Sequence, residues 1–303
     1  MQPDPSANAR GAVFMVVSMG AFTCNDALMK LALESVPFHQ ALAVRGAIAC
    51  ALVGAALLAA RPAGRRIAPR DRARVALRSL AEVAATICFI SALVEIGLPR
   101  TSAILQATPL AVTLGAALFL GEPIGWRRAL AIAIGLLGVL LIIRPGPEGF
   151  TAGSLWAALA VLVVVARDLV TRTLSPATAS LPVTAAATVA LTAYGWAGML
   201  FTDWRAMAPA GLLYLAASAV FLMIGYQTAI LAMRVGEVGF AAPFRYTALV
   251  WALLLGWLIF DDIPGPVTLT GAAIVVGSGL YAFWRERRLA RRAGARPRPA
   301  ALP

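Results

Sequence analysis

The chain has 303 residues, of which 60% are hydrophobic and 13% are charged, and its formal net charge is +12. Because soluble domains carry about 25% charged residues, this composition excludes an ordinary soluble domain and indicates a protein that crosses a membrane several times. The positive charge does not indicate nucleic-acid binding, because the basic residues lie in the C-terminal tail and in short polar stretches beside long apolar ones.

Ten apolar segments divide the chain, and each is about as long as a membrane-spanning helix. Such a helix needs roughly 20 apolar residues, because each residue rises 1.5 Å through a hydrocarbon layer about 30 Å thick. Prolines and glycines mark the joins between the segments. We predict helices over residues 10–33, 38–60, 77–97, 100–120, 127–144, 152–173, 180–201, 209–232, 237–260 and 266–284.

The first segment is predicted to remain in the protein as a helix. Asn25 and Asp26 interrupt its apolar run, and no small-x-small cleavage site follows its core, so it does not fit a secretory signal peptide. The shortest join, at Gly97-Leu98-Pro99, separates the third and fourth helices.

Arginine and lysine are distributed unequally between the two ends of these helices. Nineteen of the 26 fall on the side of both termini and four on the other side, and the remaining three lie within helices. Basic residues are retained on the cytoplasmic side of a membrane. We therefore predict a multi-pass protein of the inner (plasma) membrane with both termini in the cytoplasm and a basic tail, residues 288–303, that contacts anionic lipid.

The two halves of the chain contain similar segments about 140 residues apart. Ala103–Thr108 and Ala242–Thr247 are each followed by an apolar run, an acidic corner and a last helix that contains several glycines. Residues 1–147 and 148–287 then form two repeats of five helices each, and an odd number of helices inverts the second repeat in the membrane. Inverted repeats are typical of secondary transporters, which hold their substrate near the middle of the membrane. The predicted fold is therefore an all-α integral membrane protein of ten transmembrane helices in two inverted repeats, and the predicted mechanism is alternating access.

An ordered set of short motifs resembles the drug/metabolite transporter superfamily, in its ten-helix branch with EamA-type repeats. The resemblance covers residues 10–287 and is carried by Asn25-Asp26, Lys30, Arg45, Ser102–Gln106, Gly121-Glu122-Pro123, Ala166-Arg167-Asp168, Arg172 and Ala242–Thr247. It implies ten helices, cytoplasmic termini, a central cavity and a small-molecule substrate, and the sequence is most similar to the branch that takes up riboflavin. The chain departs from the family at Asp261-Asp262, where the family has Gly-Glu, so this corner keeps an acid but loses a glycine.

Arg245 is the first candidate for a substrate contact. It lies about eight residues into the ninth predicted helix, just after Pro243, which has no backbone N–H to donate and so frees a carbonyl oxygen at membrane depth. The guanidinium could bind a ligand there, or it could cap the freed carbonyl groups.

Other charges lie near the opposite, outer ends of the first two helices. A charge in the middle of the bilayer costs about 2.5–3.5 kcal/mol, so these side chains should face the interior of the bundle. Asp26 and Lys30 lie one turn apart and form either an ion pair at the helix end or part of a gate or cavity wall. Arg45 either extends to the outer headgroups or contacts the substrate or Asp26.

Glu82, Arg167 and Asp168 lie toward the inner ends of their helices and are predicted to form a structural or gating charge network. Adjacent helical residues point about 100° apart, so Arg167 and Asp168 are expected to reach different neighbours.

Aromatic and amide side chains complete the list of substrate-binding candidates. Tyr226, Tyr246 and Trp251 lie within predicted helices, where they could stack on a planar substrate. Gln106 and Gln227 either bind the substrate or form hydrogen bonds between helices.

The residues of a membrane enzyme are missing from the sequence. There is one histidine, His39, no CxxC pair and no phosphate-binding loop, so we predict no catalytic residues, metal site or cofactor. A non-transporting membrane protein would not need charges inside both halves. We predict a transporter of a compact, uncharged or zwitterionic metabolite: riboflavin uptake is the leading function, and export of amino acids or other amphipathic metabolites is the alternative.

Overall fold

The computed structural model describes residues 5–60, 66–122, 125–143, 151–235 and 238–294, and these residues contain helices and no strand. The α-helices are α1 (Pro5–Leu33), α2 (Phe38–Ala59), α3 (Arg72–Ile96), α4 (Leu98–Leu105), α5 (Thr108–Leu120), α6 (Trp126–Ile143), α7 (Ala152–Arg172), α8 (Ser180–Gly198), α9 (Pro209–Val235), α10 (Val238–Ala241), α11 (Thr247–Phe260) and α12 (Pro266–Gly294). Two 3₁₀ helices, η2 (Pro69–Asp71) and η3 (Ala242–Tyr246), precede α3 and α11.

Nine helices in the described residues are long and apolar enough to span a membrane, so the protein is a multi-pass membrane protein. Each of the ten predicted segments is helical, but the segment predicted over residues 180–201 is not among the nine. This segment is α8, which contains three threonines, two glycines and one proline. The sequence also misplaced three ends: α1 begins at Pro5, α3 begins at Arg72, and α12 extends the predicted last helix into the basic tail as far as Gly294.

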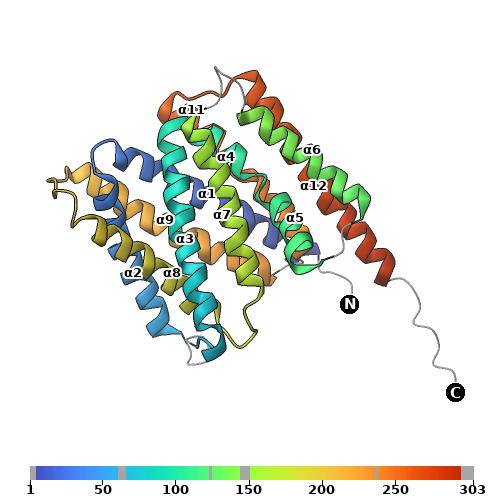
Figure 1. The fold of residues 1–303 in the computed structure, drawn as a ribbon, viewed down its shortest axis with the longest axis horizontal. Helices are drawn as coiled ribbons and strands as arrows, with labels where there is room; N and C mark the ends of the chain where they lie inside the picture. Colours follow the sequence, from blue (N-terminus) through green and yellow to red (C-terminus); the bar gives the residue numbers. More distant parts are fainter. Residues whose placement is uncertain (1–4, 61–65, 123–124, 144–150, 236–237, 295–303) are drawn as a thin grey trace.

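The helices pack in pairs that join the first half of the chain to the second (Figure 1). Helix α1 packs along α9, α3 along α7, α2 along α8 and α6 along α12. In the view of Figure 1, α6 and α12 form one edge of the bundle, whereas α2 and α8 lie at the other. Glycines allow α6 and α12 to approach closely, because a Cβ atom at Gly138 would lie 2.9 Å from the carbonyl oxygen of Gly271.

The fourth membrane segment of each half is broken at a similar place. The 3₁₀ helix η3 confirms the break predicted at Pro243. The break between α4 and α5 was not predicted, since the sequence analysis placed one continuous helix over residues 100–120. Pro109 has no N–H to donate to the carbonyl oxygen of Leu105, and the hydroxyl of Thr108 donates to that oxygen instead at 2.6 Å. Thr247 donates to the carbonyl oxygen of Phe244, also at 2.6 Å.

The corners after these broken segments also match. Helix α5 ends at Gly121 with φ of 69°, and α11 ends at Asp261 with φ of 49°, so both residues are left-handed. Besides glycine, aspartate is one of the few residues that adopt the left-handed conformation. Asp261 can therefore replace the glycine that the family has at this corner.

Candidate solute-binding cavity

A cavity of about 1200 Å³ lies between the two halves of the bundle. Residues of α1, α2, α3, α7, α8 and α9 line it, together with Arg245 of η3. Its lining on α1 runs from Met15 to Met29, which corresponds to about 21 Å of helix and thus most of a membrane span. At one end the lining includes the exposed Pro176 and Ser180, whereas Met29 at the other end is fully buried. The cavity therefore opens where α2 connects to α3 and α7 to α8.

Packed apolar side chains close the opposite end, and we call this set the plug. It consists of the buried residues Met29, Ala32, Val36, Ala41, Leu42, Ile90, Leu191 and Leu215. Behind the plug, the buried side chain of Gln40 donates to the carbonyl oxygen of Arg205 at 2.7 Å and accepts from its N–H at 3.1 Å. Two elements far apart in the sequence are thus joined at the closed end.

A polar cluster on α1, α2 and α9 lies just inside the plug. Asn25 Oδ1 accepts hydrogen bonds from Arg45 Nη1 at 3.3 Å and from Ser218 Oγ at 2.8 Å. Asn25 Nδ2 donates to Asp26 Oδ1 at 2.8 Å. Arg45 is 7% exposed, so it does not extend to the headgroups as one of its two interpretations required.

No ion pair joins Lys30 to Asp26 in the described residues, so the first of the two interpretations of these side chains does not hold. The ammonium group of Lys30 lies 4.0 Å from the centre of the Phe260 ring, outside the cavity lining. The aromatic face offers a partner on the neighbouring α11, whereas Asp26 is engaged with Asn25.

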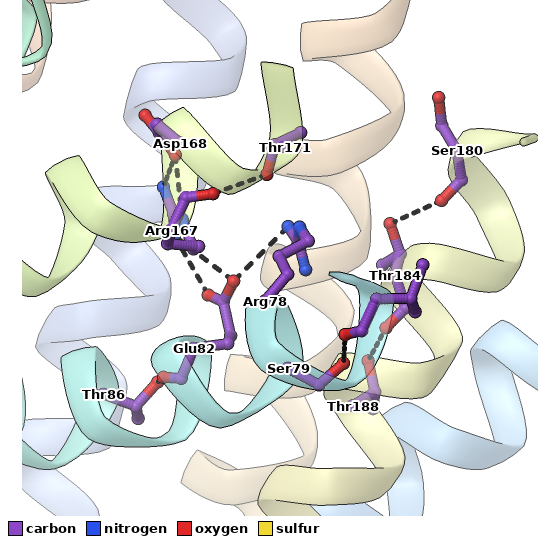
Figure 2. Close-up of polar contacts among 11 residues, drawn as sticks. Arg78, Ser79, Glu82, Thr86, Arg167, Asp168, Thr171, Ser180, Thr184 and Thr188 are labelled. Carbon is purple, nitrogen blue, oxygen red and sulfur yellow. Dashed lines mark hydrogen bonds and ion pairs between the residues drawn. The ribbon is translucent and has the colours of Figure 1, made fainter. Parts of the chain in front are cut away.

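A charge network joins α3 to α7 nearer the mouth of the cavity (Figure 2). Arg167 Nη1 lies 3.2 Å from Glu82 Oε1, and Arg167 Nη2 lies 2.8 Å from Asp168 Oδ1. Arg78 Nη2 adds a third ion pair, at 3.4 Å from Glu82 Oε2. The expectation that Arg167 and Asp168 reach separate neighbours is therefore wrong, because the long arginine side chain bends back along its own helix while still reaching α3. Arg78 was missed because its basic charge was assigned to the inner loop.

The wall formed by α8 is polar but uncharged. Thr184 donates to the carbonyl oxygen of Ser180 at 3.2 Å, and Thr188 donates to that of Thr184 at 2.9 Å (Figure 2). Each hydroxyl thus satisfies its donor within the helix and leaves oxygen lone pairs available to a solute.

Aromatic rings form another part of the wall, and the predicted aromatic and amide candidates divide into two groups. Tyr226 meets Phe22 edge to face, with ring centres 5.3 Å apart, and Gln227 is the next lining residue on α9. The other three candidates do not belong to the cavity lining. Gln106 donates to the backbone of Tyr246 at 3.2 Å, and Trp251 donates to that of Val16 at 3.3 Å. These contacts join helices, as the alternative interpretation of Gln106 proposed.

Comparison with known proteins supports this arrangement of a helical bundle around a cavity. The sequence profile of the EamA-like transporter family matches residues 9–144. The first half of the chain is therefore similar to the EamA-like transporter family. This match confirms the resemblance to the drug/metabolite transporter superfamily, and the matched family is one of membrane transporters and not of enzymes. A solved structure with 20% sequence identity covers 93% of the chain and 99% of its own length with a TM-score of 0.64, which shows the same fold.

Several relatives are identical to this chain at about a quarter of the aligned residues. A riboflavin transporter of Rhizobium johnstonii is 27% identical and covers 95% of the chain and 96% of its own length. An S-adenosylmethionine uptake transporter of Rickettsia felis is 25% identical over 59% of the chain and 61% of its own length. A pseudopaline exporter of Pseudomonas aeruginosa is 24% identical over 88% of the chain and 93% of its own length.

Proposed function

We propose that this protein is a secondary transporter that carries a small metabolite by alternating access, with riboflavin uptake as its leading function. The observation that carries the proposal is a large cavity that is open at one end and closed by the plug at the other. A solute in such a cavity can reach one side of the membrane only, and transport then requires the mouth to close and the plug to open.

The packing of the helices supports two inverted repeats, residues 1–147 and 148–287. If α1 corresponds to α7 and α3 to α9, exchanging the halves converts the α1–α9 pair into the α7–α3 pair. The same exchange maps α2–α8 and α6–α12 onto themselves. The hydroxyls of Thr108 and Thr247 also occupy corresponding places in the two halves, and each donates to the carbonyl oxygen three residues earlier. Two similar halves of opposite orientation can form inward-open and outward-open states by equivalent packings.

The mouth of the cavity is proposed to face the cytoplasm. Its rim includes Ala60, which precedes an arginine-rich stretch of the sequence, and residues of the α7–α8 connection. Both termini then lie in the cytoplasm, provided that α8 crosses the membrane as the tenth span beside α2. The state described here is accordingly the inward-open one.

Riboflavin suits the cavity on size and chemistry. Ligand pockets commonly enclose about 300–1000 Å³, so a cavity of about 1200 Å³ can hold a three-ring solute. Phe22 and Tyr226 offer ring contacts, while Thr184, Thr188 and Gln227 offer hydrogen bonds to a hydroxylated chain. The riboflavin transporter that matches nearly the whole chain supports the choice. Export of an amphipathic metabolite such as an amino acid is the second candidate, favoured by the similar match to a pseudopaline exporter.

Rescue of a riboflavin auxotroph at low external vitamin tests the proposal. The wild-type protein should restore growth, and Arg245→Ala, which alters the lining, should reduce uptake more than Arg127→Ala, which removes an exposed charge outside it. Failure of a well-expressed wild-type protein to restore growth would remove riboflavin uptake and leave export to be tested in loaded vesicles.

A further inference from the structure

The cavity wall carries more positive than negative charge. Its lining contains the four arginines Arg45, Arg78, Arg167 and Arg245 and the two acids Asp26 and Glu82. Even when Asp168 is counted, because it pairs with Arg167, one positive charge is left without a carboxylate. A surplus charge at membrane depth is costly, so a solute that brings a negative charge would be favoured there.

Among the described arginines of the lining, Arg78 is the one with buried donor atoms that lack a partner. Its side chain is 15% exposed, and its one ion pair, to Glu82, is shared with Arg167. Within the part of the chain that the structure describes, its Nε and Nη1 atoms are buried and have no hydrogen-bond partner. Buried donors without an acceptor are rare in folded proteins and indicate an absent partner. Arg245, by comparison, is an exposed side chain on the lining.

The surroundings of Arg78 suit a planar body with an anionic group attached. Tyr226 lines the same cavity as Arg78 and Arg167, so an aromatic ring belongs to the wall that holds the arginines. Figure 2 shows the guanidinium of Arg78 projecting from α3 into the space between Glu82 and α8. A guanidinium donates charge-assisted N–H bonds to carboxylate and phosphate oxygens, and Nε and Nη1 of Arg78 each have such a bond to donate.

We infer that Arg78 anchors one anionic group, a carboxylate or a phosphate ester, on a planar solute, and that Arg245 adds to the positive potential that attracts it. The inference rests on the proposed transport function and extends its substrate class, because riboflavin itself has no such group. It also revises the expectation of an uncharged or zwitterionic solute.

Binding of matched neutral and anionic probes to the purified full chain tests the inference. One pair is riboflavin and riboflavin 5′-phosphate, and the other is indole-3-acetamide and indole-3-acetate, so phosphate and carboxylate are tested separately. The wild-type protein should bind at least one anionic probe about tenfold more tightly than its neutral partner, as expected for a charge-assisted pair of hydrogen bonds. Arg78→Gln should abolish this preference and Arg245→Gln should weaken it. Arg72→Gln, which removes an exposed charge from the same helix, should leave it unchanged.

The outcomes separate this inference from the proposed function. Riboflavin binding with no preference for either anion would overturn the inference and leave riboflavin transport standing. Indole-3-acetate binding that depends on Arg78, with neither flavin bound, would support the inference and remove riboflavin. Absence of an anionic preference in both pairs, or a preference that survives Arg78→Gln in a folded protein, overturns the anchor.

Discussion

Arg167 illustrates how single residues keep charge inside the membrane segments of this protein. Its guanidinium contacts Glu82 across the helix interface and Asp168 on its own helix. The sequence indicated that these three charges form a network, because unpaired charge at that depth is costly. It could not indicate that Arg78 joins them, because the position of a basic residue at a helix end does not reveal whether its side chain points to water or to a neighbour.

Loss of the shared carboxylate should destabilise the protein more than loss of an exposed one. Glu82→Gln removes the acid between Arg78 and Arg167, and we expect the free energy of unfolding to fall by about 1–3 kcal/mol. Glu122→Gln breaks the exposed ion pair with Arg172 and should cost less than about 1 kcal/mol. Thermal unfolding in detergent measures both, and equal losses would contradict a structural role for Glu82.

Two tyrosines allow the position of the cavity to be tested by removing one hydroxyl at a time. Tyr226 lines the cavity, whereas the hydroxyl of Tyr246 is buried next to Gly279. We expect Tyr226→Phe to raise the KM for the solute several-fold, because the loss of one hydrogen bond costs about 0.5–1.5 kcal/mol. Tyr246→Phe should leave transport kinetics unchanged. A larger effect of Tyr246→Phe than of Tyr226→Phe on the KM would contradict this position and place the solute beside the Tyr246 hydroxyl.

Helix positions were predictable at the scale of elements, because the length of an apolar run is fixed by bilayer thickness. The breaks were predictable only in part. Pro243 indicated one, whereas Pro109 was overlooked within an otherwise uniform apolar run. The early start of α3 was missed because its first turn is rich in arginine.

Of the candidate site, five of the eight substrate residues line the cavity, while Gln106, Tyr246 and Trp251 join helices. The spacing of polar residues along a helix does not show whether a side chain lines the cavity or bonds to a neighbouring helix.

The join between α3 and α4 should depend on glycine at one position. Gly97 has φ of 79°, and an added Cβ atom would clash with the carboxylate of Asp262. Gly97→Ala should therefore lower the free energy of unfolding by more than the roughly 1–2 kcal/mol of left-handed strain, because ψ of 167° at this φ is also essentially restricted to glycine. Gly121→Ala, at φ of 69° with open space around it, should show that strain alone. Equal losses in thermal unfolding would mean that the contact with Asp262 is unimportant.

At the scale of the whole molecule, polar contacts join the two halves on both sides of the cavity. At the closed end, Gln40 holds the backbone of Arg205. At the mouth, the buried carboxylate of Asp71 accepts hydrogen bonds from the hydroxyls of Ser175 and Thr178, each at 2.6 Å. In alternating access, each of these contacts would either break or move together with the helices that it connects.

Access to the cavity from each side of the membrane tests the account most directly. Thr188→Cys places a thiol on the lining, and Ser35→Cys places one on the exposed turn beyond the plug. Both are made in a protein whose three cysteines are replaced by alanine. In sealed vesicles we expect an impermeant maleimide to label Thr188→Cys at least about tenfold faster from the cytoplasmic side, because the cavity is open at the end proposed to face the cytoplasm. Ser35→Cys should show the opposite preference. Labelling of Thr188→Cys only from the outer side, or from neither side, would contradict an inward-open cavity between the two halves.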